Sequence, residues 1–318
     1  RIDRRRLLLL SLLAVGLDHV ACALAPDYPV LITLRPLAVL GAAVFTPQGA
    51  ATIGLLVPPE RRATAVTTVF LGWSLASVVA MPMGSLVAAA ASWRAAFLLI
   101  ALLSVLAALV VWRVVPHGLH TPALSLASWQ AVARSRRLVL VLAATLTWCC
   151  GQFLVLAYVA PSLRQAAGVT TPAMAALLAL QGLSGLVGGV LLARRVGRMG
   201  PDRASALALG CISTGLLLWS ATTQGRLGVP AVALAMTVWG FGSFAFVSAQ
   251  QARLAVSVPE LAPASIALNS ASLYLGQALG AAAGGAVVAV AGYGLLGPIA
   301  MAVVLAALGL SLLADRHR

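Results

Sequence analysis

Long apolar segments, separated by short polar connections, occupy almost the whole chain. A helix needs about 20 apolar residues to cross the hydrocarbon core of a bilayer, and each segment approaches or exceeds that length. The pattern therefore predicts about ten membrane-spanning helices. They lie approximately at residues 7–25, 30–56, 64–91, 95–115, 138–160, 172–193, 204–222, 229–252, 264–291 and 294–314.

The composition agrees with a multi-pass membrane protein. The 318 residues are 61% hydrophobic and 9% charged, and the mean hydropathy is +1.02, a balance that a water-soluble globule cannot place on its surface. A cleavable signal peptide would contain one short apolar run, whereas here the hydrophobicity continues to Leu313. We expect an all-α protein of the cell inner (plasma) membrane, in contact with membrane lipid.

The arginines indicate the orientation. With a cytoplasmic N-terminus, the cytoplasmic side holds seventeen arginines, and the opposite side holds only Arg94, Arg164 and Arg226. This positive-inside bias places both termini in the cytoplasm. It also accounts for the net charge of +14 without a nucleic-acid partner, because the arginines form short clusters and not a continuous patch.

Several kinds of chemistry lack the residues that they need. The chain has no lysine, which excludes a nucleotide-binding loop that ends in Gly-Lys-Ser/Thr, and it has no HExxH motif or clustered-acid metal site. The four cysteines lie in apolar segments without zinc-site spacing, so we interpret them as packing residues. We therefore expect no metal, no cofactor and no enzyme activity, and we expect any work to draw on gradients.

A polar connection from His117 to Arg137 separates about four spans from about six. The predicted domains are an N-terminal helix bundle at residues 1–115, a cytoplasmic linker at 116–137 and a C-terminal six-helix bundle at 138–318.

The two bundles contain a repeat at an offset of about 200 residues. The segment 57–63 (VPPERRA) matches 258–264 (VPELAPA), and Leu75 and Gly84 then fall against Leu275 and Gly284. The matched segments run in the same direction through the membrane, so the repeat is parallel, as in the two halves of a major facilitator transporter.

The segment 193–203 (ARRVGRMGPDR) resembles the signature loop of major facilitator transporters, Gly-x-Leu-Ala-Asp-Arg-x-Gly-Arg-Arg. Residues 1–6 (RIDRRR) are similar to the last part of the same signature. Arg194 stands where the signature has its aspartate. The signature-loop positions are Arg4, Arg195, Gly197 and Arg198.

Further segments resemble the drug:proton antiporters of the sugar-efflux and chloramphenicol-resistance type. They are 24–28 (LAPDY), 58–62 (PPERR), 93–97 (WRAAF) and 268–271 (LNSA). The resemblance implies a major facilitator fold in which the spans are helices 3–12 of a twelve-helix transporter, four plus six. Two spans would then precede Arg1, and the N-terminal bundle would be incomplete.

Ionisable residues inside a span are candidates for function. Asp18 and Arg35 lie at similar depth on neighbouring predicted helices, where an intramembrane ion pair can form, and His19 points about 100° away from Asp18. The resemblance places Arg35 at the fourth-helix arginine that is associated with proton coupling. Two interpretations stay open, because Asp18 and Arg35 either pin two helices together or take part in coupling or substrate binding.

Helical spacing also predicts faces that line a substrate cavity. One face lies in the span at 138–160 and another in the span at 229–252, and the resemblance adds Thr46 from the helix that carries Arg35. The residues are Thr46, Thr145, Trp148, Gln152, Trp239, Ser243, Phe246 and Gln250. Their aromatic and amide groups suit an amphipathic substrate, although ordinary helix packing would produce the same spacing.

Small residues recur every four positions in two repeat-related helices and predict close helix contacts. They are Gly72, Ala76, Ala80 and Gly84 in one helix, and Ser272, Gly276, Gly280 and Gly284 in the other. Pro82 resembles the antiporter motif of the fifth helix, with a structural kink as the alternative.

The leading hypothesis is a monomeric secondary transporter that exports a small amphipathic molecule, such as a drug, sugar or metabolite, in exchange for protons by alternating access. One alternative is a ten-helix drug/metabolite exporter with inverted five-span halves. A membrane-embedded enzyme acting on lipids would need clustered acids or histidines, which are dispersed here. The remaining alternative is an inactive fragment of a major facilitator transporter.

Overall fold

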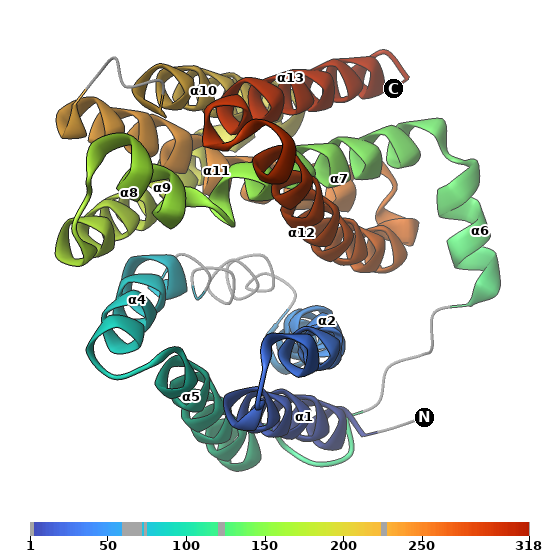
Figure 1. The fold of residues 1–318 in the computed structure, drawn as a ribbon. Helices are drawn as coiled ribbons and strands as arrows, with labels where there is room; N and C mark the ends of the chain where they lie inside the picture. The colour runs from blue at the N-terminus through green and yellow to red at the C-terminus, as the bar shows by residue number, and fades with distance from the viewer. Residues whose placement is uncertain (1–2, 59–71, 73–74, 120–124, 224–227, 318) are drawn as a thin grey trace. The chain divides into compact units, whose positions relative to one another are not determined.

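The computed structural model describes residues 3–58, 72, 75–119, 125–223 and 228–317, which are helical with short connections (Figure 1). Within this described part, nine helices are long and apolar enough to cross a membrane. The expected all-α membrane fold is confirmed. The further expected span at 64–91 lies partly outside the described residues, and its described end contains a shorter apolar helix at Val78–Ala90.

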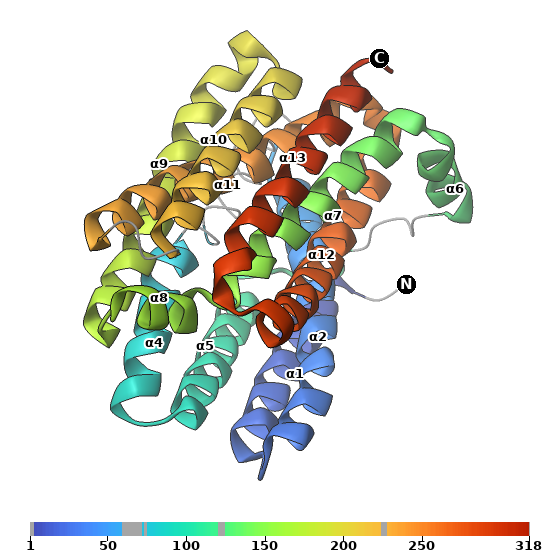
Figure 2. The same cartoon turned by 45° about the horizontal axis from the view of Figure 1, so that its top comes forward.

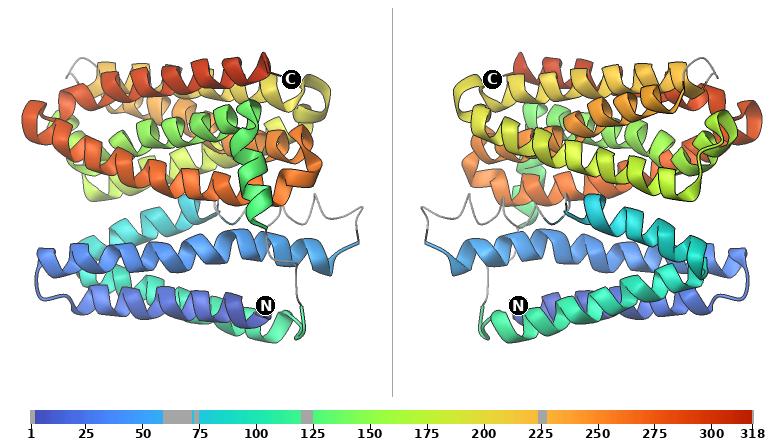
Figure 3. Two further views of the ribbon diagram at one scale, coloured as in Figure 1. Left: turned by 90° about the vertical axis from the view of Figure 1, so that its right-hand side faces the viewer. Right: turned by 90° about the vertical axis from the view of Figure 1, so that its left-hand side faces the viewer.

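The chain forms two compact units, one of Arg1–Trp73 with Met83–Ala123 and one of Ser74–Pro82 with Leu124–Arg318. The helices of the first part of the chain are α1 (Arg4–Leu24), α2 (Tyr28–Leu56), α4 (Met81–Ala90) and α5 (Trp93–Val114). In the first unit, α1 packs against both α2 and α5, and the side views in Figure 3 show α1 and α2 running in opposite directions beside each other.

Capping residues decide where α2 and α5 begin. The carboxylate of Asp27 accepts a hydrogen bond from the Val30 N–H at 2.9 Å, and the hydroxyl of Ser92 accepts one from the Ala95 N–H at 3.2 Å. These side chains satisfy N–H groups that the first turn of a helix leaves without partners.

The second unit is a larger bundle (Figure 2). Its helices are α6 (Leu126–Arg134), α7 (Arg136–Leu156), α8 (Val159–Ala167), α9 (Thr171–Met199), α10 (Pro201–Thr223), α11 (Val229–Ser257), α12 (Ala262–Ala291) and α13 (Leu296–Asp315). α7 packs against α12 and α13, α9 packs against α11, and α10 packs against α11 and α13.

Glycines allow the backbones of α7 and α12 to approach closely. A Cβ atom on Gly280 would lie 2.2 Å from the carbonyl oxygen of Cys150, and one on Gly284 would lie 2.6 Å from that of Leu154. Both distances are too short for any side chain. The close contact expected at these two glycines is therefore present.

The packing inside each unit follows the predicted repeat. In the first unit α1 contacts the next helix, α2, and the last, α5; in the second unit α10 contacts the next helix, α11, and the last, α13. α7 and α9 have no counterpart among the described helices of the first unit. The two corresponding helices also differ in burial. In the apolar stretch of α2, 6% of the residues are buried, against 56% in that of α11.

The connection that was expected to be a plain linker contains a short helix, α6. The hydroxyl of Ser125 caps it by accepting a hydrogen bond from the Ser128 N–H. Val132 is fully buried in a cluster with Leu138 and Leu254, and Trp129 packs against that cluster. An amphipathic helix of nine residues is less than half the length of a membrane span, so a pattern of long apolar segments does not predict it.

A π-helical turn, η2 (Ala76–Ala80), directly precedes Met81 and Pro82. The N–H of Met81 bonds to the carbonyl of Ala76, five residues earlier. Proline lacks an N–H and crowds the preceding turn, and π-turns are a recognised cause of helix kinks. A local distortion thus accompanies Pro82, whereas its role as an antiporter motif stays a prediction.

Candidate functional site

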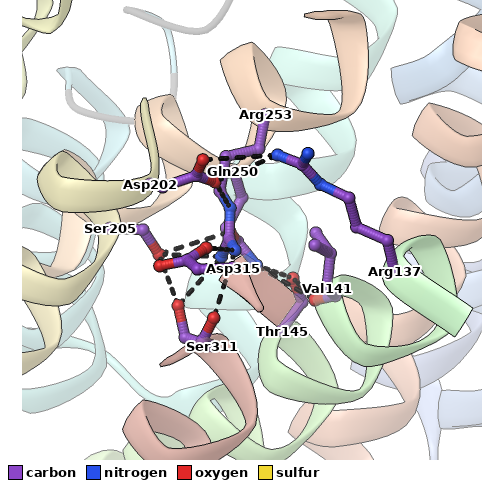
Figure 4. Close-up of polar contacts among 9 residues, drawn as sticks. All are labelled: Arg137, Val141, Thr145, Asp202, Ser205, Gln250, Arg253, Ser311 and Asp315. Carbon is purple, nitrogen blue, oxygen red and sulfur yellow. Dashed lines mark hydrogen bonds and ion pairs between the residues drawn. The ribbon is translucent and has the colours of Figure 1, made fainter. Parts of the chain in front are cut away.

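Arg253 lies near the end of α11 and is the centre of a buried ion network (Figure 4). Its side chain is fully buried. Its Nε donates to Oδ1 of Asp202 at 2.7 Å, and its Nη2 donates to Oδ1 of Asp315 at 2.7 Å. Arg137 adds a second cation, with its Nη2 3.3 Å from Oδ2 of Asp202. Two arginines thus face two carboxylates.

Polar groups complete the surroundings of the Arg253 guanidinium. Its Nη1 donates to the hydroxyl of Ser311 at 2.9 Å and to Oε1 of Gln250 at 3.1 Å, and its Nη2 also donates to the Ser311 carbonyl at 3.2 Å. A buried charge is tolerated only when it is both paired and hydrogen-bonded. The network meets both conditions and holds the ends of α7, α10, α11 and α13 together.

A tight turn places Asp202 in this network. α9 continues to Met199, Gly200 follows with a φ of +82°, and Pro201 begins α10. Glycine tolerates a positive φ, and proline suits the first helical position. Asp202 therefore lies in the first turn of α10, where the helix dipole favours a carboxylate.

The position of the acid corrects the interpretation of the signature segment. Arg195, Gly197 and Arg198 lie within α9 and not in a loop, because the chain turns only at Gly200. The carboxylate of this connection comes from Asp202, eight residues after Arg194, the position at which the signature has its aspartate.

Sequence reasoning missed this network because the expected spans were too short. α11 continues to Ser257 and α13 to Asp315, whereas the spans were expected to end at 252 and 314. Arg253 and Asp315 therefore fall just outside the predicted spans. A polar residue within one helical turn of a predicted span end, on each of several spans, is the signal that would have found them.

Gln250 links the ion network to the interior of the second unit. Its Oε1 accepts from Arg253, while its Nε2 donates to the Thr145 hydroxyl at 2.8 Å and to the Val141 carbonyl at 3.0 Å. A continuous hydrogen-bonded path thus runs from Asp202 through Arg253 and Gln250 to Thr145.

The two faces predicted for a cavity in this unit come together. Oε1 of Gln152 accepts hydrogen bonds from Nε1 of Trp239 at 2.9 Å and from the Ser243 hydroxyl at 3.1 Å. The rings of Trp148 and Phe246 lie 4.7 Å apart. Nε1 of Trp148 is buried without a hydrogen-bond partner among the described residues. Substrate binding by these residues stays a prediction.

In the first unit, Asp18, Cys22 and Arg35 form a polar cluster. The thiol of Cys22 donates to Oδ2 of Asp18 at 3.6 Å and also interacts with Arg35. Oδ1 of Asp18 is buried and has no partner among the described residues. The direct Asp18–Arg35 ion pair considered from the sequence is not among the ion pairs of the described residues, since the guanidinium instead lies 5.5 Å from the centre of the Phe97 ring.

The remaining candidates have separate surroundings. His19 is a helix-contact residue, with its ring 5.9 Å from that of Phe97, and the Thr46 hydroxyl donates to the Ala42 carbonyl at 3.1 Å. The Arg4 N–H donates to the Leu119 carbonyl at 3.0 Å. A Cβ atom on Gly72 or Gly84 would meet no described atom within 4 Å, so helix contacts there stay predictions.

Known proteins resemble this chain over nearly its whole length. The family model described as Major Facilitator Superfamily matches residues 1–281. The inner membrane transport protein YdhP of Escherichia coli (strain K12) is 30% identical over 287 residues, which cover 89% of this chain and 72% of that protein. A probable sugar efflux transporter of Helicobacter pylori is 26% identical over 308 residues, covering 97% of this chain and 78% of that protein.

Solved transporters share the fold. The human organic anion transporter MFSD10 matches with a TM-score of 0.74 at 18% identity, covering 97% of this chain and 77% of that one. A bacterial homologue of the human lysosomal transporter Spinster, in an inward-facing and unoccupied conformation, matches with a TM-score of 0.69 at 16% identity. That match covers 100% of this chain and 84% of the homologue.

Proposed function

Because this chain belongs to the major facilitator superfamily of membrane transporters, we propose that it exports a small amphipathic molecule in exchange for protons, by alternating access. The family places the two bundles in a parallel repeat. A ten-helix exporter with inverted five-span halves, considered above as an alternative, is therefore wrong for this chain.

The contacts inside the second unit support an uncharged, partly aromatic or sugar-like substrate. Gln152, Ser243 and Trp239 form a hydrogen-bonded cluster, and the neighbouring rings of Trp148 and Phe246, tilted by 51°, lie on the same two helices. The charged residues of the described second unit lie near helix ends or in connections. Aromatic rings together with amide and indole groups suit a molecule with apolar faces and hydrogen-bonding edges.

Asp18 is the proposed proton carrier. Its carboxylate is buried on α1. Its Oδ1 has no hydrogen-bond partner among the described residues. The Cys22 thiol donates to the other oxygen, Oδ2 of Asp18, at 3.6 Å, and the Arg35 guanidinium interacts electrostatically with that thiol. A carboxyl group that is shielded from bulk water but close to a cation can exchange a proton as its surroundings change. Efflux as the direction agrees with the name of the Helicobacter relative.

Localisation follows from the same proposal. The Escherichia coli relative is named an inner membrane protein, and the arginine distribution favours cytoplasmic termini. We place the chain in the inner membrane with both ends in the cytoplasm, working as a monomer.

Transport in proteoliposomes tests the proposal. The purified chain is reconstituted with a pH-sensitive dye inside, and sugars and amphipathic drugs are added outside together with a proton gradient. We expect substrate-dependent proton movement. In Asp18→Asn we expect that movement to be lost, while exchange of labelled substrate for unlabelled substrate persists.

Asp27→Asn is the matched control, because the Asp27 side chain caps α2 and asparagine caps a helix equally well. It should keep both activities. Normal proton coupling in Asp18→Asn would contradict the assignment of the proton carrier. A folded wild-type chain that moves neither protons nor substrate would favour the inactive-fragment alternative.

A further inference from the structure

The ion network turns its acids inward and leaves neighbouring arginines facing outward. Asp202 and Asp315 point toward the buried Arg253, whereas the next residues in the sequence, Arg203 and Arg316, are exposed. The same alternation occurs at the start of α7, where Arg137 contacts Asp202 and Arg136 is exposed. At this end of the second unit, the buried ion network thus carries no net charge, and the exposed side chains beside it are cationic.

No acid neutralises these outer arginines within the described second unit. Its acids are Asp202, Asp315 and the exposed Glu260. The first two are paired with Arg253, and Glu260 forms no ion pair with another described residue. Arg195 and Arg198, in the last two turns of α9, are exposed as well. These cations therefore require an external anion or water.

Three of the outer arginines stand one helical turn beyond exposed leucines. Arg195 follows Leu191 on α9, and Leu207 follows Arg203 on α10, each pair four residues apart and both members exposed.

The same spacing recurs on a third helix. At the end of α13 the exposed pair is Leu312 and the capping residue Arg316. Residues four apart share a helix face, so on three helices the cation lies at the border of an apolar, lipid-facing surface. That border is the level of the lipid headgroups.

We propose that Arg195, Arg203 and Arg316, with Arg136 and Arg198 beside them, bind the phosphates of anionic phospholipids in the adjoining leaflet. Acyl chains cover the leucines below, so a headgroup phosphate is the anion that is presented at this height. The guanidinium group matches phosphate oxygens with paired hydrogen bonds. The opposite end of the unit contrasts with this arrangement, because Arg164 there donates to the Thr171 hydroxyl at 3.5 Å.

Lipid titration of the detergent-purified chain tests this proposal. Binding of dioctanoyl-phosphatidylglycerol is compared with that of dioctanoyl-phosphatidylcholine, which has the same chains but no net charge. We expect tighter binding of the anionic lipid. Each arginine near a membrane surface contributes about fivefold, so Arg195→Gln, Arg203→Gln and Arg316→Gln together should weaken phosphatidylglycerol binding roughly a hundredfold.

Arg164→Gln is the matched control and should leave the lipid preference unchanged. Three results would overturn the proposal: equal binding of the two lipids, a preserved preference in the triple variant, or complete displacement of phosphatidylglycerol by an equal concentration of inorganic phosphate. Size-exclusion chromatography checks folding. If the triple variant aggregates, the three single variants replace it, each with an expected loss of about fivefold.

Discussion

Arg253 and Asp202 form a fully buried ion pair, with 2.7 Å between Nε and Oδ1, that joins the end of α11 to the start of α10. The same guanidinium reaches Asp315 at the end of α13. One arginine therefore connects three helix ends, and we expect these helices to move as one body.

Removal of one acid should therefore destabilise the second unit. Asp202→Ala leaves a buried guanidinium with one carboxylate, and breaking a buried pair costs about 3–5 kcal/mol. Asp315→Ala should cost less, because the Asp315 side chain is 24% exposed against 6% for Asp202 and water screens the lost charge. Thermal unfolding in detergent measures the stability losses of the two variants. Arg203→Gln, which changes an exposed neighbour of Asp202, is the control. Equal loss in all three variants would contradict the network.

Gln152 should be required for the integrity of the interior cluster. Gln152→Leu keeps the volume but removes the acceptor for Trp239 and Ser243, and an unpaired buried donor costs about 1–3 kcal/mol. We expect lower stability and weaker substrate binding, measured by unfolding and by tryptophan fluorescence. Gln152→Glu keeps an acceptor oxygen, so its stability and its substrate binding should lie between those of Gln152→Leu and the wild type. Thr237→Ala, on the same helix as Trp239, removes only a bond to its own helix and should have little effect.

The glycines of α12 should be intolerant of side chains where α7 approaches. In Gly280→Ala the added methyl group would meet the Cys150 carbonyl oxygen at 2.2 Å, so the helices must separate, at a cost of about 1–3 kcal/mol or more. Gly84→Ala meets no described atom and should be neutral or stabilising by up to about 1 kcal/mol, because alanine favours helix. Unfolding temperatures of the two variants measure the contrast. Equal unfolding temperatures for the two variants would contradict a close contact at Gly280, because helix propensity alone favours alanine at both positions.

Burial of Val132 should hold α6 against the bundle. Val132→Asp places a charge in the cluster with Leu138 and Leu254, which should release the helix and speed trypsin cleavage after Arg134. Leu126→Asp makes the same change at a position that is 72% exposed and should leave cleavage unchanged. Equal cleavage of Val132→Asp and the wild type would show that α6 is held by other contacts.

The apolar pattern predicted the helices because a bilayer offers no hydrogen bonds to an exposed backbone, so each long apolar segment must be helical. Helical spacing also predicted that Thr145, Trp148 and Gln152 share one face, and that Trp239, Ser243, Phe246 and Gln250 share another. Contacts such as Gln152 with Trp239 join those faces. The pattern failed at helix ends, where apolar length does not mark the last turn, and so Arg253 was placed outside its helix.

The sequence alone thus determined the fold class, the distribution of charge and the faces of individual helices, because these depend on local periodicity and on transfer into lipid. Only the tertiary structure decided which charges meet. Asp202, Arg253 and Asp315 are far apart in the chain, and their pairing depends on the packing of α10, α11 and α13. Packing likewise placed Arg35 over Phe97 instead of in direct contact with Asp18, since depth in the membrane fixes the level of a side chain but not the direction in which it points.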